Sequence, residues 1–135
     1  MPEVPRLGEV YLRAGRVEEA THYTERVLEF ARAHHERGRE AWSLCLLGEI
    51  IAHRGPHALE QAAVHYQQAL ALVNELGMRP LQAHCYHGLG TLYSQMDQAE
   101  QARAALTTAD ALYREMEMTF WLPEVEVALA EMEAR

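Results

Sequence analysis

The chain of 135 residues contains no lysine, and all twelve of its basic residues are arginine. This absence excludes the lysine of a phosphate-binding P-loop and any lysine that forms a Schiff base with a substrate. Serine is scarce as well, and neither Ser43 nor Ser94 stands in the G-x-S-x-G turn that presents a catalytic serine. We therefore expect a protein without enzymatic activity and without a bound cofactor.

The sequence also offers little for nucleic-acid, membrane or disulfide chemistry. The formal net charge of −8, with no local basic cluster, opposes binding to a phosphate backbone. No stretch approaches the roughly 18 consecutive apolar residues of a membrane span, and the segment MPEVPRLGEV lacks the features of a signal peptide. Cys45 and Cys85 lack CxxC spacing, which favours reduced thiols in the cytosol. These features predict a soluble, cytoplasmic protein that binds neither nucleic acid nor membrane.

What the sequence does contain is a repeat. Residues 7–20, 47–62 and 89–102 align with one another. Each copy begins with Leu-Gly, runs through an apolar helix and a short turn, and reaches an alanine that opens a second, amphipathic helix. A glycine inside a helix costs about 1 kcal/mol relative to alanine, so three glycines at one register imply a shared reason. We infer that Gly8, Gly48 and Gly90 leave space for the close approach of the next helix in each copy.

The three copies resemble the tetratricopeptide repeat (TPR), whose pattern is W-x2-L-G-x2-Y followed by A-x3-F. No copy has the family's tryptophan, and Thr24 replaces the expected aromatic residue in the first copy, which is the weakest match. The landmark glycines are 40 and 42 residues apart, and this period is longer than the roughly 34 residues of the common repeat. The matched positions are Val4, Leu7, Gly8, Tyr11, Ala20 and Thr24 in the first copy, Leu44, Leu47, Gly48, Ile51, Ala62 and Tyr66 in the second, and Tyr86, Leu89, Gly90, Tyr93, Ala102 and Leu106 in the third.

The resemblance implies an all-α fold, a right-handed superhelix of three helix pairs with a terminal capping helix. We expect one domain over residues 1–135, with repeats at about 4–37, 39–77 and 80–117 and a terminal helix at about 120–133. The inner helices are expected at 5–14, 39–54 and 80–95, and the outer helices at 16–36, 59–76 and 98–117. Gly38 and Gly77 suit helix C-caps, Pro80 suits a helix start, and Asp97 with Glu100 suits a capping box.

The long period and the segment ELGMRPLQAHCYHGLGTLY also resemble the C-terminal repeat arrays of multidomain bacterial signalling proteins, such as those that join a cyclase or regulator domain to an ATPase. This second resemblance implies only the repeat array, because nothing in these residues carries cyclase or ATPase chemistry. It suggests a place in a signalling or regulatory assembly.

In the TPR family the face of the inner helices is the concave groove that receives peptides, and the resemblance carries this role to the matched positions here. Chaperone-binding relatives hold a peptide's C-terminal carboxylate with groove lysines and asparagines, which this predicted groove lacks because Asn74 lies on an outer helix. Carboxylates at Glu9 and Glu49, together with the net acidity, favour a neutral or basic partner. Residues at helical spacing line the predicted groove: Glu9, Arg13, Trp42, Cys45, Glu49, His53, His84, His87, Thr91 and Gln95.

The resemblance therefore implies a non-catalytic scaffold that binds a protein or peptide segment in the concave groove. One alternative is a homo-oligomerisation module, because the first repeat starts with a short helix and no polar cap, so that a second copy could cover an end face. A less favoured alternative is a metal- or ligand-sensing domain, in which His84, His87 and Cys45, with Glu49 as a fourth ligand, would bind zinc.

Overall fold

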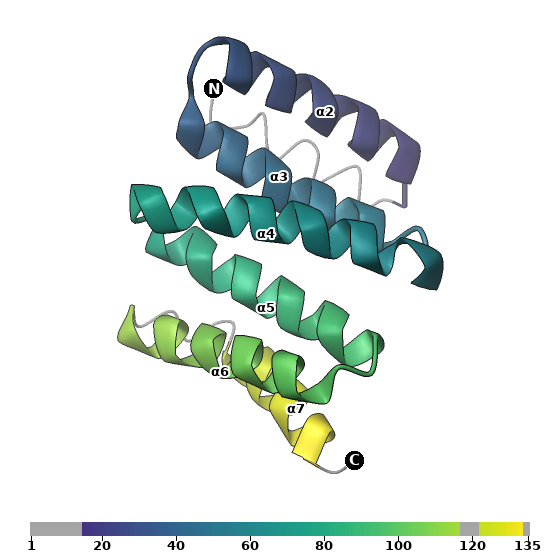
Figure 1. Ribbon diagram of the computed structural model, residues 1–135, viewed down its shortest axis with the longest axis vertical. Helices are drawn as coiled ribbons and strands as arrows, with labels where there is room; N and C mark the ends of the chain where they lie inside the picture. Colours follow the sequence, from purple (N-terminus) through teal and green to yellow (C-terminus); the bar gives the residue numbers. More distant parts are fainter. Residues whose placement is uncertain (1–14, 117–121, 134–135) are drawn as a thin grey trace. The chain divides into compact units, whose positions relative to one another are not determined.

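Figure 1 shows a computed structural model of the chain, which describes residues 15–116 and 122–133. All the regular structure in these two ranges is helical. The predicted first inner helix, with Gly8, Glu9 and Arg13, lies outside the described residues. The helices are α2 (Val17–Ala33), α3 (Arg37–Ala52), the short 3-10 helix η1 (Pro56–Ala58), α4 (Leu59–Leu76), α5 (Arg79–Gln95), α6 (Ala99–Glu115) and α7 (Leu122–Glu133).

The helix boundaries agree with the sequence prediction to within a few residues, and two of the predicted end signals are confirmed. Gly77 follows α4 with a φ of +71°, a left-handed conformation that glycine adopts without steric cost. Pro80 is the second residue of α5, where its missing N–H is not needed for an intrahelical hydrogen bond. These two residues end one helix and begin the next.

The predicted C-cap at Gly38 is wrong, because Gly38 lies inside α3. The chain turns earlier, at His35, which takes a left-handed φ of 57° directly after the C-cap residue of α2. The Glu36 N–H donates to the Ala31 carbonyl at 2.8 Å, which is the hydrogen bond of a Schellman motif. Histidine is among the residues that tolerate this conformation, so the turn forms without glycine.

The predicted capping box at Asp97 is wrong for a related reason. Asp97 has a φ of 59°, and the following Gln98 N–H donates to the Tyr93 carbonyl at 2.9 Å. These features make Asp97 the left-handed residue that closes α5, and Gln98 is the N-cap residue of α6. An N-cap residue normally has an extended backbone, so Asp97 cannot also cap α6 from its left-handed conformation.

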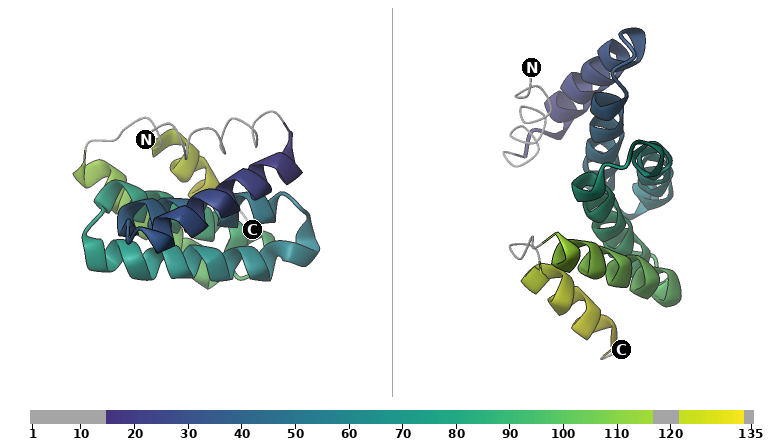
Figure 2. Two further views of the ribbon diagram at one scale, coloured as in Figure 1. Left: turned by 90° about the horizontal axis from the view of Figure 1, so that it is seen from above. Right: turned by 90° about the vertical axis from the view of Figure 1, so that its left-hand side faces the viewer.

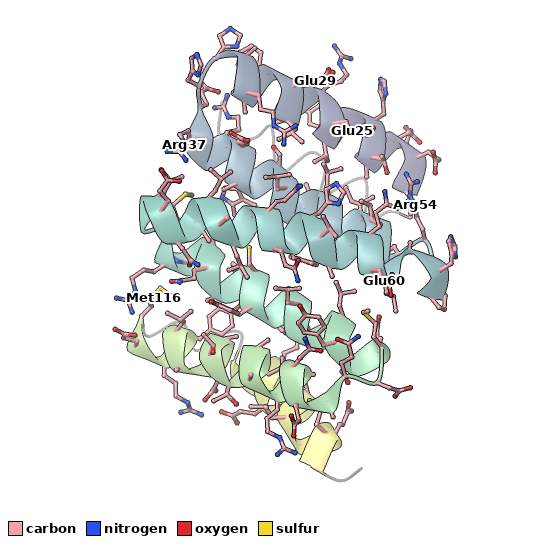
Figure 3. All side chains as sticks on the ribbon, in the orientation of Figure 1. Glu25, Glu29, Arg37, Arg54, Glu60 and Met116 are labelled. Atoms are coloured by element: carbon pink, nitrogen blue, oxygen red, sulfur yellow. The ribbon has the colours of Figure 1, made fainter. Side chains whose placement is uncertain are left out.

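The chain divides into two compact units, Met1–Leu76 and Gly77–Arg135, which we call unit 1 and unit 2. In unit 1, α3 packs against both α2 and α4. Its side chains are therefore buried on most sides, and it is apolar around most of its circumference. Ala20 of α2 joins Leu46 and Ile50 of α3 in a buried cluster. Arg54, just after α3, reaches across to α2 and donates to Thr21 Oγ1 at 3.0 Å (Figure 3).

In unit 2, α5 and α6 form a helical hairpin, and α7 packs mainly against α6 (Figure 2). The terminal helix contributes Val125 and Met132 to the core, so it covers an apolar surface of the hairpin. The buried core of this unit consists of Ala83, Ala102, Leu106, Ala109, Tyr113, Val125 and Met132.

The close helix approach inferred at the repeat glycines is confirmed at the two that the structure describes. A Cβ atom at Gly48 would lie 2.9 Å from the Tyr66 ring of α4. A Cβ atom at Gly90 would lie 2.5 Å from Leu106 Cγ of α6. Tyr66 and Leu106 occupy the same position of the repeat, so one packing arrangement is built twice.

Equivalent ion pairs also join the open ends of the two hairpins. Arg37 at the start of α3 binds both carboxylate oxygens of Glu75 near the end of α4, at 3.0 and 2.6 Å (Figure 3). Arg79 at the start of α5 pairs with Glu115 at the end of α6, at 2.5 Å. The hydrogen bond and the charge of Arg37 lower the pKa of Glu75. All four side chains are exposed, so these pairs are expected to add little stability.

Candidate functional site

The predicted groove residues of unit 1 lie at helical spacing along α3. Trp42 is half-buried and Cys45 is only 7% exposed, whereas Glu49 and His53 are exposed. His53 is the C-cap residue of α3, and its Nδ1 lies 2.9 Å from the Glu49 carbonyl oxygen. This face therefore changes from apolar and covered to polar and accessible toward the end of the helix.

The predicted groove residues of unit 2 follow the same order along α5. His84 and His87 are half-buried, and Thr91 and Gln95 are exposed. The Thr91 hydroxyl donates to the carbonyl of His87 at 3.1 Å, which holds the side chain along the helix. In both units the accessible polar positions lie in the second half of the inner helix.

His84 and His87 meet the same side chain of α6. The hydroxyl of Tyr113 lies 2.9 Å from Nδ1 of His84 and 3.5 Å from Nδ1 of His87. Both imidazole rings stand edge-on to the tyrosine ring, with centroid distances of 5.6 and 6.1 Å. Tyr113 is fully buried and belongs to the core of unit 2. The two histidines therefore face the helix core on one side as well as the predicted groove.

The contacts of Tyr113 with His84 and His87 form a hydrogen-bond chain, and its geometry favours a particular arrangement of protons. A tyrosine hydroxyl has one proton to donate, and its oxygen can accept further hydrogen bonds. The shorter distance favours donation from Tyr113 to Nδ1 of His84, which must then carry its own proton on Nε2. Nδ1 of His87 is placed to donate to the same oxygen through a longer contact. The two neutral imidazoles are thus expected to be opposite tautomers.

Burial sets the electrostatics of the pair. Removal from water disfavours the charged imidazole and lowers the pKa of both histidines below the ordinary value. Repulsion from His87 lowers the pKa of His84 further, while the carboxylate of Glu124 on α7 acts on His87 in the opposite direction. Both imidazoles are therefore held neutral at pH 7.

The sequence prediction missed Tyr113 as a partner of the histidines. A signal for it exists in the apolar pattern of α6, where Ala102, Leu106, Ala109 and Tyr113 follow the spacing of a single helix face. That face packs on α5, so the Tyr113 hydroxyl could have been expected to meet a polar residue of α5. The pattern did not show which residue of α5 that would be.

The described residues do not bring together a metal site. Among residues 15–116 and 122–133, no three histidine, cysteine, aspartate or glutamate side chains are grouped so that they could hold an ion. Of the predicted zinc ligands, Cys45 and Glu49 belong to unit 1, and His84 and His87 belong to unit 2. Cys45 and Cys85 are both buried thiols.

Comparison with known proteins shows the class of fold. Residues 83–115, which cover most of α5 and all of α6, match the family model of the tetratricopeptide repeat. The chain is similar in structure to the apo form of RapI, with a TM-score of 0.85 and 18% sequence identity. The all-α, TPR-like superhelical class of fold, with helices packed in pairs, is confirmed by this likeness.

The extent of these matches limits what they say about function. The likeness to RapI covers 96% of this chain but only 46% of the RapI chain, and at 18% identity it concerns the fold alone. No curated protein matches the chain in sequence. In the part of the chain that the structure describes, every helix is too short or too polar to cross a bilayer.

Proposed function

We propose that this chain is a non-catalytic scaffold that binds a protein or peptide segment through the accessible faces of its inner helices. The observation that carries the proposal is the TPR-like fold, whose general role is protein interaction, together with exposed polar residues at the positions where that fold receives a partner. These residues are Glu49 and His53 on the first inner helix described, and Thr91 and Gln95 on the next.

The charge of the chain points to the chemistry of the partner. Glu49 is exposed near the end of α3, and the net charge of −8 adds to its field. Opposite charge on the partner would speed association and favour the correct register. A neutral or basic segment therefore fits this face better than an acidic one.

We also propose that the protein acts in the cytoplasm, as part of a signalling or regulatory assembly.

A capture experiment with mass spectrometry would identify the partner, and charge-neutral variants would then locate the surface. Glu49→Gln is expected to weaken the affinity by about 1–3 kcal/mol if this residue lies near the centre of the interface, and to reduce the dependence of binding on salt. Glu60→Gln on the outer helix α4 removes the same charge from another exposed position and serves as the control (Figure 3).

Equal losses in the two variants would contradict binding at the inner helices, because only one of the residues lies there. Partner binding that responds to the control alone would assign the interface to the outer helices.

The alternative proposal is self-association through the exposed face of α7. It is favoured by Val127, which is 57% exposed on the terminal helix α7. Sedimentation of the purified chain would test it, since Val127→Glu should dissociate a dimer that uses this helix. A monomer at all accessible concentrations would remove the alternative.

A further inference from the structure

Unit 2 contains only two of the eight histidines of the chain, and both contact one hydroxyl. His84 and His87 meet Tyr113, while the other six histidines belong to unit 1. A change in imidazole charge within unit 2 therefore acts at a single place. Histidine is the side chain whose ordinary pKa, about 6.5, lies within the range that cells and compartments reach.

That place lies where the three helices of unit 2 come together. Tyr113 extends from α6 to the histidines of α5, and its ring belongs to the same buried cluster as Val125 and Met132 of α7. Glu124, at the start of α7, acts electrostatically on His87. Disturbing the hydroxyl would therefore disturb the contacts of α6 with both neighbouring helices.

The hydrogen-bond chain is complete when both imidazoles are neutral and cannot be complete when both are charged. A protonated imidazole carries a proton on both nitrogens, so Nδ1 of His84 would become a donor. The Tyr113 proton would then lose its acceptor at 2.9 Å. Two positive charges three residues apart on one helix would also repel each other. Protonation thus replaces an attractive chain with a repulsive pair in a partly buried site.

The charged groups near this site do not reverse that conclusion. On α7, Glu124 favours a charge on His87, but the effect of burial is larger. On α6, Asp110 is bound to Arg114 at 3.1 Å, and Arg114 in turn pairs with Glu126 of α7 at 2.6 Å. On α5 itself, the charge of His87 disfavours a charge on His84.

We propose that the chain of His84, Tyr113 and His87 is a proton-sensitive latch that holds α5, α6 and α7 together when both imidazoles are neutral and loosens unit 2 when they take up protons. The latch goes beyond the proposed function and does not depend on it, because it concerns the packing of unit 2 in the absence of any partner.

The direction of the pH effect follows from linkage. The unfolded chain binds a proton on each histidine near pH 6.5, whereas the folded unit holds both pKa values lower. The stabilisation is therefore complete above about pH 6.5 and decreases as the pH falls through this value toward the lower pKa of the folded state. Acid is expected to open unit 2, and base is not.

Hydrogen exchange on the full chain at pH 7.5 and pH 5.0, corrected for intrinsic rates, would test the latch. The protection of amides in α5, α6 and α7 is expected to fall several-fold at the lower pH relative to that of α3 and α4. His84→Gln with His87→Gln should abolish this additional loss, because glutamine keeps hydrogen-bonding groups but does not titrate. His22→Gln with His65→Gln, in unit 1, should leave it unchanged.

An equal loss of protection in both units, or a loss that persists in the His84 and His87 double variant, would overturn the proposal. If the double variant does not fold, NMR titration of the unmodified chain decides the matter. The imidazole signals of His84 and His87 and the amide signals of α7 should then titrate together at a midpoint below 6.5. Amides of α7 that do not respond while the histidines titrate would also overturn the latch.

Discussion

The hairpins α3–α4 and α5–α6 place different chemistry at the same positions of one repeat. Aligning Gly48 with Gly90 matches Trp42 with His84 and Cys45 with His87. Aligning Ala62 with Ala102 on the outer helices matches Val73 with Tyr113, and both of these are fully buried. The matched sets are Trp42, Cys45 and Val73 in the first hairpin, and His84, His87 and Tyr113 in the second.

The difference shows that the two hairpins keep the register of the repeat while the chemistry at the matched positions changes. An apolar set is stabilised by burial, which has no preferred partner and no dependence on protonation. A polar set at the matched positions must satisfy its donors and acceptors, and its stability then depends on the number of protons bound. The stability of the second hairpin is therefore expected to depend on pH, whereas the first hairpin has no histidine at the matched positions.

Truncating the matched outer residues should give the largest contrast between the hairpins. Tyr113→Ala is expected to reduce the free energy of unfolding by about 3–5 kcal/mol, because it leaves a large cavity among three helices. Val73→Ala removes only two methyl groups and is expected to cost about 2 kcal/mol. Chemical denaturation followed by circular dichroism would measure both. If the two variants lose similar amounts of unfolding free energy, Tyr113 contributes less to packing than its burial implies.

Adding one methyl group at the repeat glycines should have the next largest effect. Gly90→Ala would place Cβ 2.5 Å from Leu106 Cγ, and Gly48→Ala would place it 2.9 Å from the Tyr66 ring. Overpacking of this kind costs about 1–3 kcal/mol, and the greater helix propensity of alanine offsets about 1 kcal/mol of it. Thermal unfolding should rank Gly90→Ala as the more harmful change. Gly77→Ala would be a poor control, because φ is +71° there.

Breaking the ion pairs at the open ends of the hairpins should have the smallest effect. Arg37→Gln and Arg79→Gln each remove one exposed pair, with Glu75 and Glu115 respectively. We expect only a slight decrease in melting temperature at low salt, and none at high salt, where exposed charges are screened. The bidentate pair of Arg37 should show the larger decrease. A substantial decrease that persists at high salt would mean that these pairs are less exposed in solution.

The sequence predicted the helices that the structure describes, their order, and the close approach at Gly48 and Gly90. The helices follow from apolar periodicity, and the close approach follows from the cost of a glycine inside a helix. It did not predict the turns at His35 and Asp97. The commonest roles of glycine and aspartate predict a C-cap at Gly38 and a capping box at Asp97, whereas a left-handed histidine or aspartate depends on where the packed helices end. It also placed His84 and His87 on the correct helix without finding Tyr113, since that contact depends on the rotation of α6 about its own axis. The assignment of the predicted groove residues to a binding surface remains a prediction.

The turn between α3 and α4 shows how much variation in length the repeat tolerates. From Gly48 to Ala62 the second copy is two residues longer than the third is from Gly90 to Ala102. Gly55, with a φ of +124°, and the short helix η1 take up the extra length, while the glycine of each hairpin still meets its matched partner. An insertion at this turn changes the spacing of the repeat without changing the contact between its two helices. The matched contacts are those of Gly48 with Tyr66 and of Gly90 with Leu106. The contact between the two helices of a repeat therefore tolerates a change of two residues in the turn that joins them.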